Sequence, residues 1–145
     1  MPIHGNGGHA KVVRELDIQP ETGWIIAVGD NAARQKESRQ YREFARAIHK
    51  KAIISPSASI GLGTVVMAGV VVQANARIGN HVILNSSCSV DHDCIIEDFA
   101  HIAPGVHLCG GVHIGEGALV GVGSCAVPKA VVPPWAIIPA GSIIK

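Results

Sequence analysis

An unbroken six-residue repeat is the feature that most limits how this 145-residue chain can fold. Every sixth residue from Ile48 to Ile144 is a large aliphatic, with Ala126 as the single exception. The residue four positions after each of these is small or medium-sized throughout. Neither the 3.6-residue period of a helix nor the two-residue alternation of a simple strand produces this register. The repeat therefore predicts one structural unit, used again every six residues.

A single six-residue unit is too small to make its own hydrophobic core. It supplies one inward aliphatic and one inward small side chain, so successive units must stack to exclude water. The composition suits flat β layers, because 48% of the residues are hydrophobic but only 3% are aromatic. We therefore expect a coil of short strands. Glycines directly after the aliphatic position are expected at its turns, where they permit backbone conformations that a Cβ would hinder; these are Gly61, Gly79, Gly115 and Gly121.

The first 47 residues lack the repeat and predict a small α/β piece. The glycine-rich segment 4–9 (HGNGGH) precedes a short helix, an arrangement in which backbone N–H groups can hold a phosphate. An ordinary tight turn explains these glycines equally well. Trp24–Val28 is expected as a strand, Asn31 as a helix cap and residues 32–47 as a helix. We expect two parts, residues 1–47 and residues 48–145.

Composition and charge favour a small-molecule partner over nucleic acid or a membrane. The 12 basic and 11 acidic residues give a net charge of +1, which provides no basic surface for nucleic acid. An apolar run of about 18 residues and a signal-like leader are both missing, so we expect a cytoplasmic protein without a membrane span. The four cysteines form neither a CxxC pair nor a metal-ligand spacing, and we expect them to be reduced packing residues.

The repeat resembles that of the hexapeptide-repeat family, whose members fold as left-handed parallel β-helices with three hexads per triangular turn. The segments GNGGHAKVV, IIAVGDNAAR and SVDHDCIIEDFAHIAPGVHLCGG resemble, more narrowly, the sialic-acid and bacillosamine acetyltransferase group. This resemblance covers nearly the whole chain. It implies a homotrimeric, acetyl-CoA-dependent acetyltransferase that modifies an amine or hydroxyl of a nucleotide-activated or surface-polysaccharide-precursor sugar. It also implies that a Rossmann-like N-terminal piece binds the sugar nucleotide, and that acetyl-CoA lies between neighbouring subunits.

The resemblance assigns the catalytic roles to the DHDC motif at residues 91–94. His92 corresponds to the general base, and Asp93, or conceivably Asp91, to the carboxylate that orients its ring. Imidazole suits this task because its ordinary pKa, near 6.5, lies close to working pH. A neighbouring carboxylate stabilises the protonated ring, as the third member of a triad does. The acetyl group would pass directly to the acceptor, without a covalent enzyme intermediate.

The remaining predicted site residues also come from the resemblance. Asn85 and His101 correspond to residues that line the acetyl-CoA groove. Gly110 corresponds to a glycine whose backbone N–H meets the thioester oxygen of acetyl-CoA. The residues that correspond to the sugar-nucleotide loop are Gly7, Gly8 and His9. The chain departs from the group between Ile18 and Trp24, where only residues 19–23 replace a longer strand and loop.

Two other functions stay open at the level of sequence. A stable coil without activity would be an idle trimeric scaffold. A metalloenzyme like the γ-type carbonic anhydrases would use the same coil, but the coil histidines are 11, 9, 6 and 6 residues apart and lack the close H-x4-H pair of that family, so no metal is expected. Those histidines are His81, His92, His101, His107 and His113. We expect His81, His107 and His113, which belong to no motif, on the surface.

Overall fold

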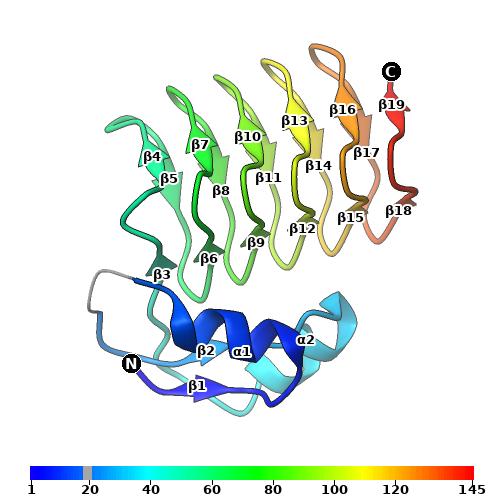
Figure 1. Cartoon of the computed structure of the whole chain (residues 1–145). Helices are drawn as coiled ribbons and strands as arrows, with labels where there is room; N and C mark the ends of the chain where they lie inside the picture. Colours follow the sequence, from blue (N-terminus) through cyan, green and yellow to red (C-terminus); the bar gives the residue numbers. More distant parts are fainter. Residues whose placement is uncertain (18–20) are drawn as a thin grey trace.

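A coil of short strands forms most of the molecule, and a small α/β piece packs beside it (Figure 1). The computed structural model describes residues 1–17 and 21–145. The shortened segment noted above begins within residues 18–20, which lie outside the described residues. In Figure 1 the N-terminal piece lies below the coil, and the C-terminus lies at the end of the coil remote from β3.

The N-terminal piece contains two strands and two helices. They are β1 (Ile3–His4), α1 (Gly8–Glu15), β2 (Ile25–Ile26) and α2 (Asn31–Ser38), and β1 pairs with β2 in parallel. The predicted strand is thus shorter than Trp24–Val28. Within the described residues, no helix has the length and apolarity that crossing a membrane requires.

The second helix differs from its prediction at both ends. Asp30, not Asn31, is the N-cap, and its side chain accepts a hydrogen bond of 2.7 Å from the Ala33 N–H. The helix ends at Ser38 instead of continuing to Ala47. Residues 43–45 are extended because they hydrogen-bond with Trp24, which pairs with Phe44 in an isolated bridge. This pairing across the chain outweighs the local helical preference of the segment.

The coil has three faces, each a parallel sheet. Face 1 contains β3 (Ala47–Ile48), β6 (Val65–Val66), β9 (Ile83–Leu84), β12 (His101–Ile102), β15 (Leu119–Val120) and β18 (Ile137–Ile138). Face 2 contains β4 (Ile53–Ile54), β7 (Val71–Val72), β10 (Ser89–Val90), β13 (His107–Leu108), β16 (Cys125–Ala126) and β19 (Ile143–Ile144). Face 3 contains β5 (Ser59–Ile60), β8 (Arg77–Ile78), β11 (Ile95–Ile96), β14 (His113–Ile114) and β17 (Val131–Val132).

Strands of one face are three hexads apart in sequence. Ile83 pairs with His101, which pairs in turn with Leu119, and the same 18-residue step recurs on faces 2 and 3. The predicted parallel β-helix of hexapeptide repeats, with its small α/β piece, is confirmed. Because strands in register place equivalent side chains above one another, each position of the hexad becomes a column along the coil.

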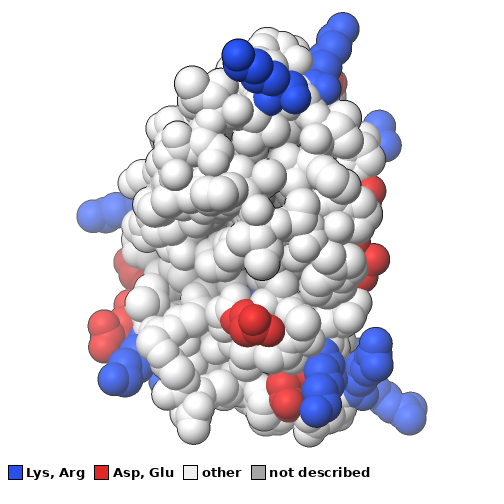
Figure 2. Space-filling model, turned by 90° about the vertical axis from the view of Figure 1, so that its right-hand side faces the viewer, with Lys and Arg blue, Asp and Glu red and all other residues white. Residues whose placement is uncertain are grey.

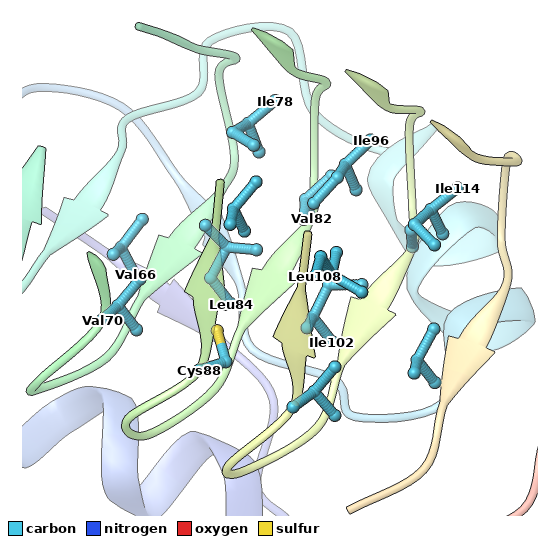
Figure 3. Packing of buried hydrophobic residues seen from close by; sticks show 14 of the residues in the cluster. Val66, Val70, Ile78, Val82, Leu84, Cys88, Ile96, Ile102, Leu108 and Ile114 are labelled. Atoms are coloured by element: carbon cyan, nitrogen blue, oxygen red, sulfur yellow. The ribbon is translucent and has the colours of Figure 1, made fainter. Parts of the chain in front are cut away.

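The core consists of the columns that the repeat predicts. Leu84, Ile96, Ile102 and Leu108 point into the prism and are buried, together with small residues such as Cys88 (Figure 3). Each such aliphatic contributes about 1.5–3 kcal/mol by leaving water. Two of the four cysteines do not follow the prediction of packing residues. Cys109 and Cys125 are exposed, because Cys125 is the outward residue of β16 and Cys109 lies in the turn directly after β13.

The turn glycines allow neighbouring coils to approach closely. A Cβ added to Gly61 would lie 2.4 Å from the carbonyl oxygen of Gly79 on the next coil, and Gly115 and Gly121 face similar backbone contacts. None of these glycines has a positive φ. The prediction that these turns need a backbone conformation special to glycine is therefore wrong; glycine is needed because neighbouring coils leave no room for a Cβ.

Adjacent isoleucines of β11 test the inward and outward assignment. Ile96 points into the prism and is 1% exposed, whereas Ile95 points outward and is 38% exposed. We expect Ile96→Ala to lower the free energy of unfolding by about 2–5 kcal/mol, because it leaves a cavity. Ile95→Ala is the matched control and should cost about 1 kcal/mol or less. Urea unfolding curves measure both, and equal losses would contradict the assignment.

Candidate functional site

The turn between β10 and β11 carries the histidine of the DHDC motif, at the corner where faces 2 and 3 meet. His92 Nδ1 lies 2.7 Å from Asp93 Oδ2, and Asp91 Oδ1 accepts a hydrogen bond of 2.7 Å from the His92 backbone N–H. Asp93 has a φ of 59°, in the left-handed region that Asp and Asn tolerate better than most residues. With Nδ1–H directed at Asp93, the Nε2 of His92 is the ring atom left to accept a proton.

Two carboxylates increase the basicity of this imidazole. The hydrogen bond that His92 donates to Asp93 raises the pKa of His92, and the charge of Asp91 raises it further. The same hydrogen bond lowers the pKa of Asp93, which therefore stays ionised at neutral pH. Both side chains are mostly exposed, at 61% and 59%, so the pair is open to a ligand.

Gly110 lies directly beside the His92 ring, on the next coil. A Cβ at Gly110 would lie 2.5 Å from His92 Nε2, so only glycine leaves the imidazole in this position. The neighbouring Gly111 N–H donates a 2.9 Å hydrogen bond to the His92 carbonyl. The Gly110 N–H has no hydrogen-bond acceptor among the described residues. A free backbone donor and a basic nitrogen are thus adjacent.

A second cluster joins the coil to the N-terminal piece. Asn85 follows β9, and its Nδ2 lies 3.1 Å from Nε2 of His101 in β12. Burial, and then the charge of Arg34, lower the pKa of His101 to about 4. The pKa of His9 is also lowered to about 4, by burial and by Arg34, and its Nε2 is buried without a partner among the described residues. These histidines are neutral at pH 7.

The two clusters lie at different corners of the prism. Asn85 stands at the corner between faces 1 and 2, whereas His92 stands at the corner between faces 2 and 3, and β10 runs between them. A groove of about 230 Å³ on face 2 lies between the corners, lined by Ser89, Asp91, His107 and Cys109 among others. One chain therefore brings His92, Asp93 and Gly110 together, but it does not bring Asn85 and His101 to them.

The predicted loop residues line a cavity in the N-terminal piece. This cavity has a volume of about 460 Å³. Gly7 is the N-cap of α1 and makes no side-chain cap hydrogen bond, so the first backbone N–H groups of the helix are available to a ligand. The residues that line the cavity are His4, Gly5, Asn6, Gly7, Gly8, His9, Ala27, Val28, Gly29, Ala33 and Glu37.

The contact between the N-terminal piece and the coil, called the joint below, is built around the buried side chain of Arg34. Arg34 is 1% exposed, and burial lowers its pKa to about 10, so the guanidinium stays charged at neutral pH. It donates to the carbonyls of Val28 on one side and of His81 and Phe99 on the other, at 2.7–2.9 Å. Asn31 reinforces the joint, because its Nδ2 donates to the Gly117 carbonyl at 3.0 Å.

The prediction that His81 is a surface residue is wrong. The side chain is 6% exposed, stacks on Phe99 at 5.0 Å and meets Phe44 edge-on at 4.4 Å. Burial and Arg34 lower its pKa to about 4. The sequence gives no sign that His81 is buried, because the residues that cover it come from the N-terminal piece and from the next coil. His107 is exposed beside Ser89, and His113 is partly exposed and lies 2.6 Å from Glu97.

The chain is similar to known sugar acetyltransferases in sequence and in structure. No protein-family model matches the chain. The UDP-N-acetylbacillosamine N-acetyltransferase of Bacillus subtilis (strain 168) is 41% identical over 66 residues, which cover 42% of this chain and 31% of that protein. The match thus spans about a third of the length of this curated relative.

Solved structures extend the similarity to the whole chain. The acetyltransferase domain of PglB from Neisseria gonorrhoeae FA1090 has a TM-score of 0.92 and 32% identity, covering 99% of this chain and 90% of that one. PerB from Caulobacter crescentus, solved in complex with CoA and GDP-perosamine, has a TM-score of 0.93 and 33% identity, covering 99% and 87%. This chain belongs to the hexapeptide-repeat sugar N-acetyltransferase family.

Membership in the sugar N-acetyltransferase family confirms the resemblance predicted from the sequence. The PglB domain has also been solved with acetyl coenzyme A, and perosamine N-acetyltransferase has been solved as variants in which one histidine is replaced by alanine or asparagine. Within residues 1–17 and 21–145, no group of three or more His, Cys, Asp or Glu side chains could hold a metal ion.

Two features of this family member were missed from the sequence. The segment GDNAAR places Asn31 and Arg34 three residues apart on one face of α2, a spacing that could have indicated a shared contact. His4 and Glu37, which line the N-terminal cavity, carry no sequence signal. They come together only in the fold, where His4 Nε2 lies 3.3 Å from Glu37 Oε2.

The basicity of His92 can be measured directly. Asp93→Asn keeps a residue that tolerates positive φ but removes the charged hydrogen-bond partner. Because Asp93 raises the pKa of His92, we expect this variant to have a lower His92 pKa. NMR titration of the ring protons, assigned with His92→Ala, measures the change. An unchanged or higher pKa would show that Asp93 does not control the ring.

Proposed function

We propose that this chain transfers the acetyl group of acetyl-CoA to the amino group of a nucleotide-linked amino sugar, with His92 as the general base. The observation that carries the proposal is the contact of His92 Nε2 with Gly110, which pairs a basic nitrogen with a free N–H donor. Relatives solved with acetyl coenzyme A, or with CoA and GDP-perosamine, support the choice of both substrates. Since acetyl-CoA is used in the cytoplasm, the proposal places the reaction there.

The chemistry needs one proton to move as one bond forms. The neutral amine attacks the thioester carbonyl carbon, and His92 Nε2 accepts the proton that the nitrogen loses. The carbon–sulfur bond then breaks. The thiolate of CoA takes this proton from the His92 imidazolium and leaves as the thiol. Asp93 stabilises the imidazolium that exists between these two events.

Gly110 supplies the second requirement, a donor for the developing oxyanion. Its N–H makes no hydrogen bond within the described residues, so no existing contact must break before it meets the thioester oxygen. A donor placed in this way is typically worth about 2.7–4 kcal/mol in the transition state.

The sugar nucleotide would occupy the N-terminal cavity. Backbone N–H groups at the start of α1, next to Gly7 and Gly8, suit a phosphate. His9 and Gly29 line the same cavity, and the Gly29 backbone lies next to His101 of the second cluster. The acceptor amine would therefore emerge from the cavity toward Asn85 and His101.

A trimer would complete the site, because one chain holds its two halves at different corners. A neighbouring subunit can present its His92 corner to the Asn85 and His101 corner of this one. Apolar side chains exposed on the strands support association; these are Ile53, Val131, Ile137 and Ile143. Figure 2, which faces the C-terminal end of the coil, shows most Lys, Arg, Asp and Glu near its margins.

Loss of the His92 imidazole tests the proposed base. We expect His92→Ala to lower kcat by about 10²–10⁴-fold, the usual contribution of a general base. His113→Ala, which removes a coil histidine outside the proposed site, is the control and should keep its activity. The assay is acetyl transfer from acetyl-CoA to UDP- and GDP-linked amino sugars. Full turnover by His92→Ala would exclude His92 as the base. A parent that does not bind acetyl-CoA would instead indicate an idle scaffold.

Mixed assemblies test whether two subunits share each site. His92→Ala and Asn85→Ala, co-expressed with different affinity tags, should each be impaired alone. In a closed trimer of both variants, one of the three interfaces combines an intact His92 with an intact Asn85. We therefore expect purified mixed trimers to regain about a third of the parent activity. No recovery would place both residues in a site formed by a single chain.

A further inference from the structure

A carboxylate is held in place at one end of the N-terminal cavity. Glu37 lines the cavity, and its Oε2 lies 3.3 Å from His4 Nε2 and accepts a hydrogen bond from the side chain of Gln40. His4 is itself fixed by Tyr41, whose hydroxyl lies 2.7 Å from His4 Nδ1 and whose ring packs on Trp24 at 4.5 Å. The other oxygen of Glu37, Oε1, has no hydrogen-bond donor among the described residues. It is free to bind a ligand.

Glu37 stands far from the end of the cavity where acetyl transfer would occur. The acceptor end is marked by Gly29 and His9, next to His101. Ala33 and Glu37 follow on the cavity side of α2, one helical turn apart. With a rise of about 1.5 Å per residue, Glu37 lies roughly 6 Å beyond Ala33 and about 9 Å from Asn31, the first residue of the helix. The start of α1 lines the same cavity.

Hydrogen-bond donors and a hydrogen-bond acceptor line different parts of the cavity. The N–H groups at the start of α1 are donors and suit phosphate oxygens. Glu37 is an acceptor and would repel phosphate, but it suits hydroxyl donors. No Lys or Arg is found among the described residues that line the cavity. A matching ligand thus carries both a phosphate and, away from the reacting amine, hydroxyl donors.

We propose that Glu37 binds the ribose hydroxyls of a nucleoside diphosphate sugar and so makes this chain select nucleotide-linked acceptors. The proposal rests on the proposed function and names the residue that would decide its substrate class. In dinucleotide-binding folds an acidic residue about 20 positions after the glycine loop holds the ribose. Here the described part of the small sheet contains only β1 and β2, and Glu37 of α2 takes over that task.

Nucleotide binding tests the assignment without requiring turnover. The probes are UDP, GDP and their 2′,3′-dideoxy counterparts, measured by calorimetry on the full chain. We expect the parent to bind UDP or GDP about 10-fold to 100-fold more tightly than the matching dideoxy nucleotide, since hydrogen bonds to a charged group contribute this much. Glu37→Gln should lose most of this preference. Glu43→Gln, an exposed carboxylate away from the cavity, is the matched control and should keep it.

Three results would overturn the assignment of Glu37. They are equal binding of both nucleotides by the parent, an unchanged preference in Glu37→Gln, or weaker binding of a methyl glycoside of the amino sugar to Glu37→Gln. The last result would place the sugar, not the ribose, at Glu37. If the parent still acetylates nucleotide sugars in any of these cases, the proposed function stands and only this assignment fails. A parent that binds nucleotides with the expected preference but not acetyl-CoA would keep the assignment and lose the proposed function.

Discussion

Stacking of each hexad on the one 18 residues away is the constraint on which the rest of the structure depends. No single turn of the coil has a core, so each inward side chain is buried only by the coils above and below it. The parallel ladders hold this register on all three faces, and the turn glycines let the coils come close enough for the core to be dry. The position of every outward side chain follows from the same register.

The proposed site uses this register in two ways. His92 and Gly110 are 18 residues apart, so they occupy equivalent turn positions on consecutive coils, and the missing Cβ of Gly110 makes room for the imidazole. Asn85 and His92 belong to successive corners of one coil, and a face separates them. A rigid prism cannot fold one of its corners onto the next. An active centre that needs both residues must therefore take them from two subunits.

The joint between the two parts depends on a different kind of contact. The chain has few aromatic residues, yet Phe44 and Phe99 meet His81 at this joint. Arg34 adds a buried charge whose partners are carbonyls from both sides. Burying such a charge costs free energy, and several hydrogen bonds to the charged group are needed to offset that cost. The joint therefore fixes Gly29 of the N-terminal piece relative to His101 of the coil.

Residues whose surroundings follow from the repeat could be predicted from the sequence, and residues placed by distant contacts could not. The burial of Leu84, Cys88 and Ile96 follows from their positions in the hexad alone. The end of α2 at Ser38 depends on pairing with Trp24, and the burial of His81 depends on Phe44, both of which lie outside the local pattern. The proposed roles of His92 and Gly110 follow from the resemblance, since a six-residue period by itself distinguishes no turn from another.

The 18-residue period also limits how such a chain can change in length. An insertion of one or two residues within the coil would turn inward side chains outward in every later turn, whereas a looped-out insertion at a corner or a whole extra coil would leave the faces aligned. Even a whole inserted coil must pack against the side chains of the coils on both sides of it. At one corner the rings of His81 and Trp135 lie over Gly63 and Gly117 while Phe99 stacks on His81, so a duplicated turn would change which ring meets which neighbour. Relatives are therefore expected to gain or lose turns in steps, chiefly at the ends of the coil, where fewer neighbours must be matched.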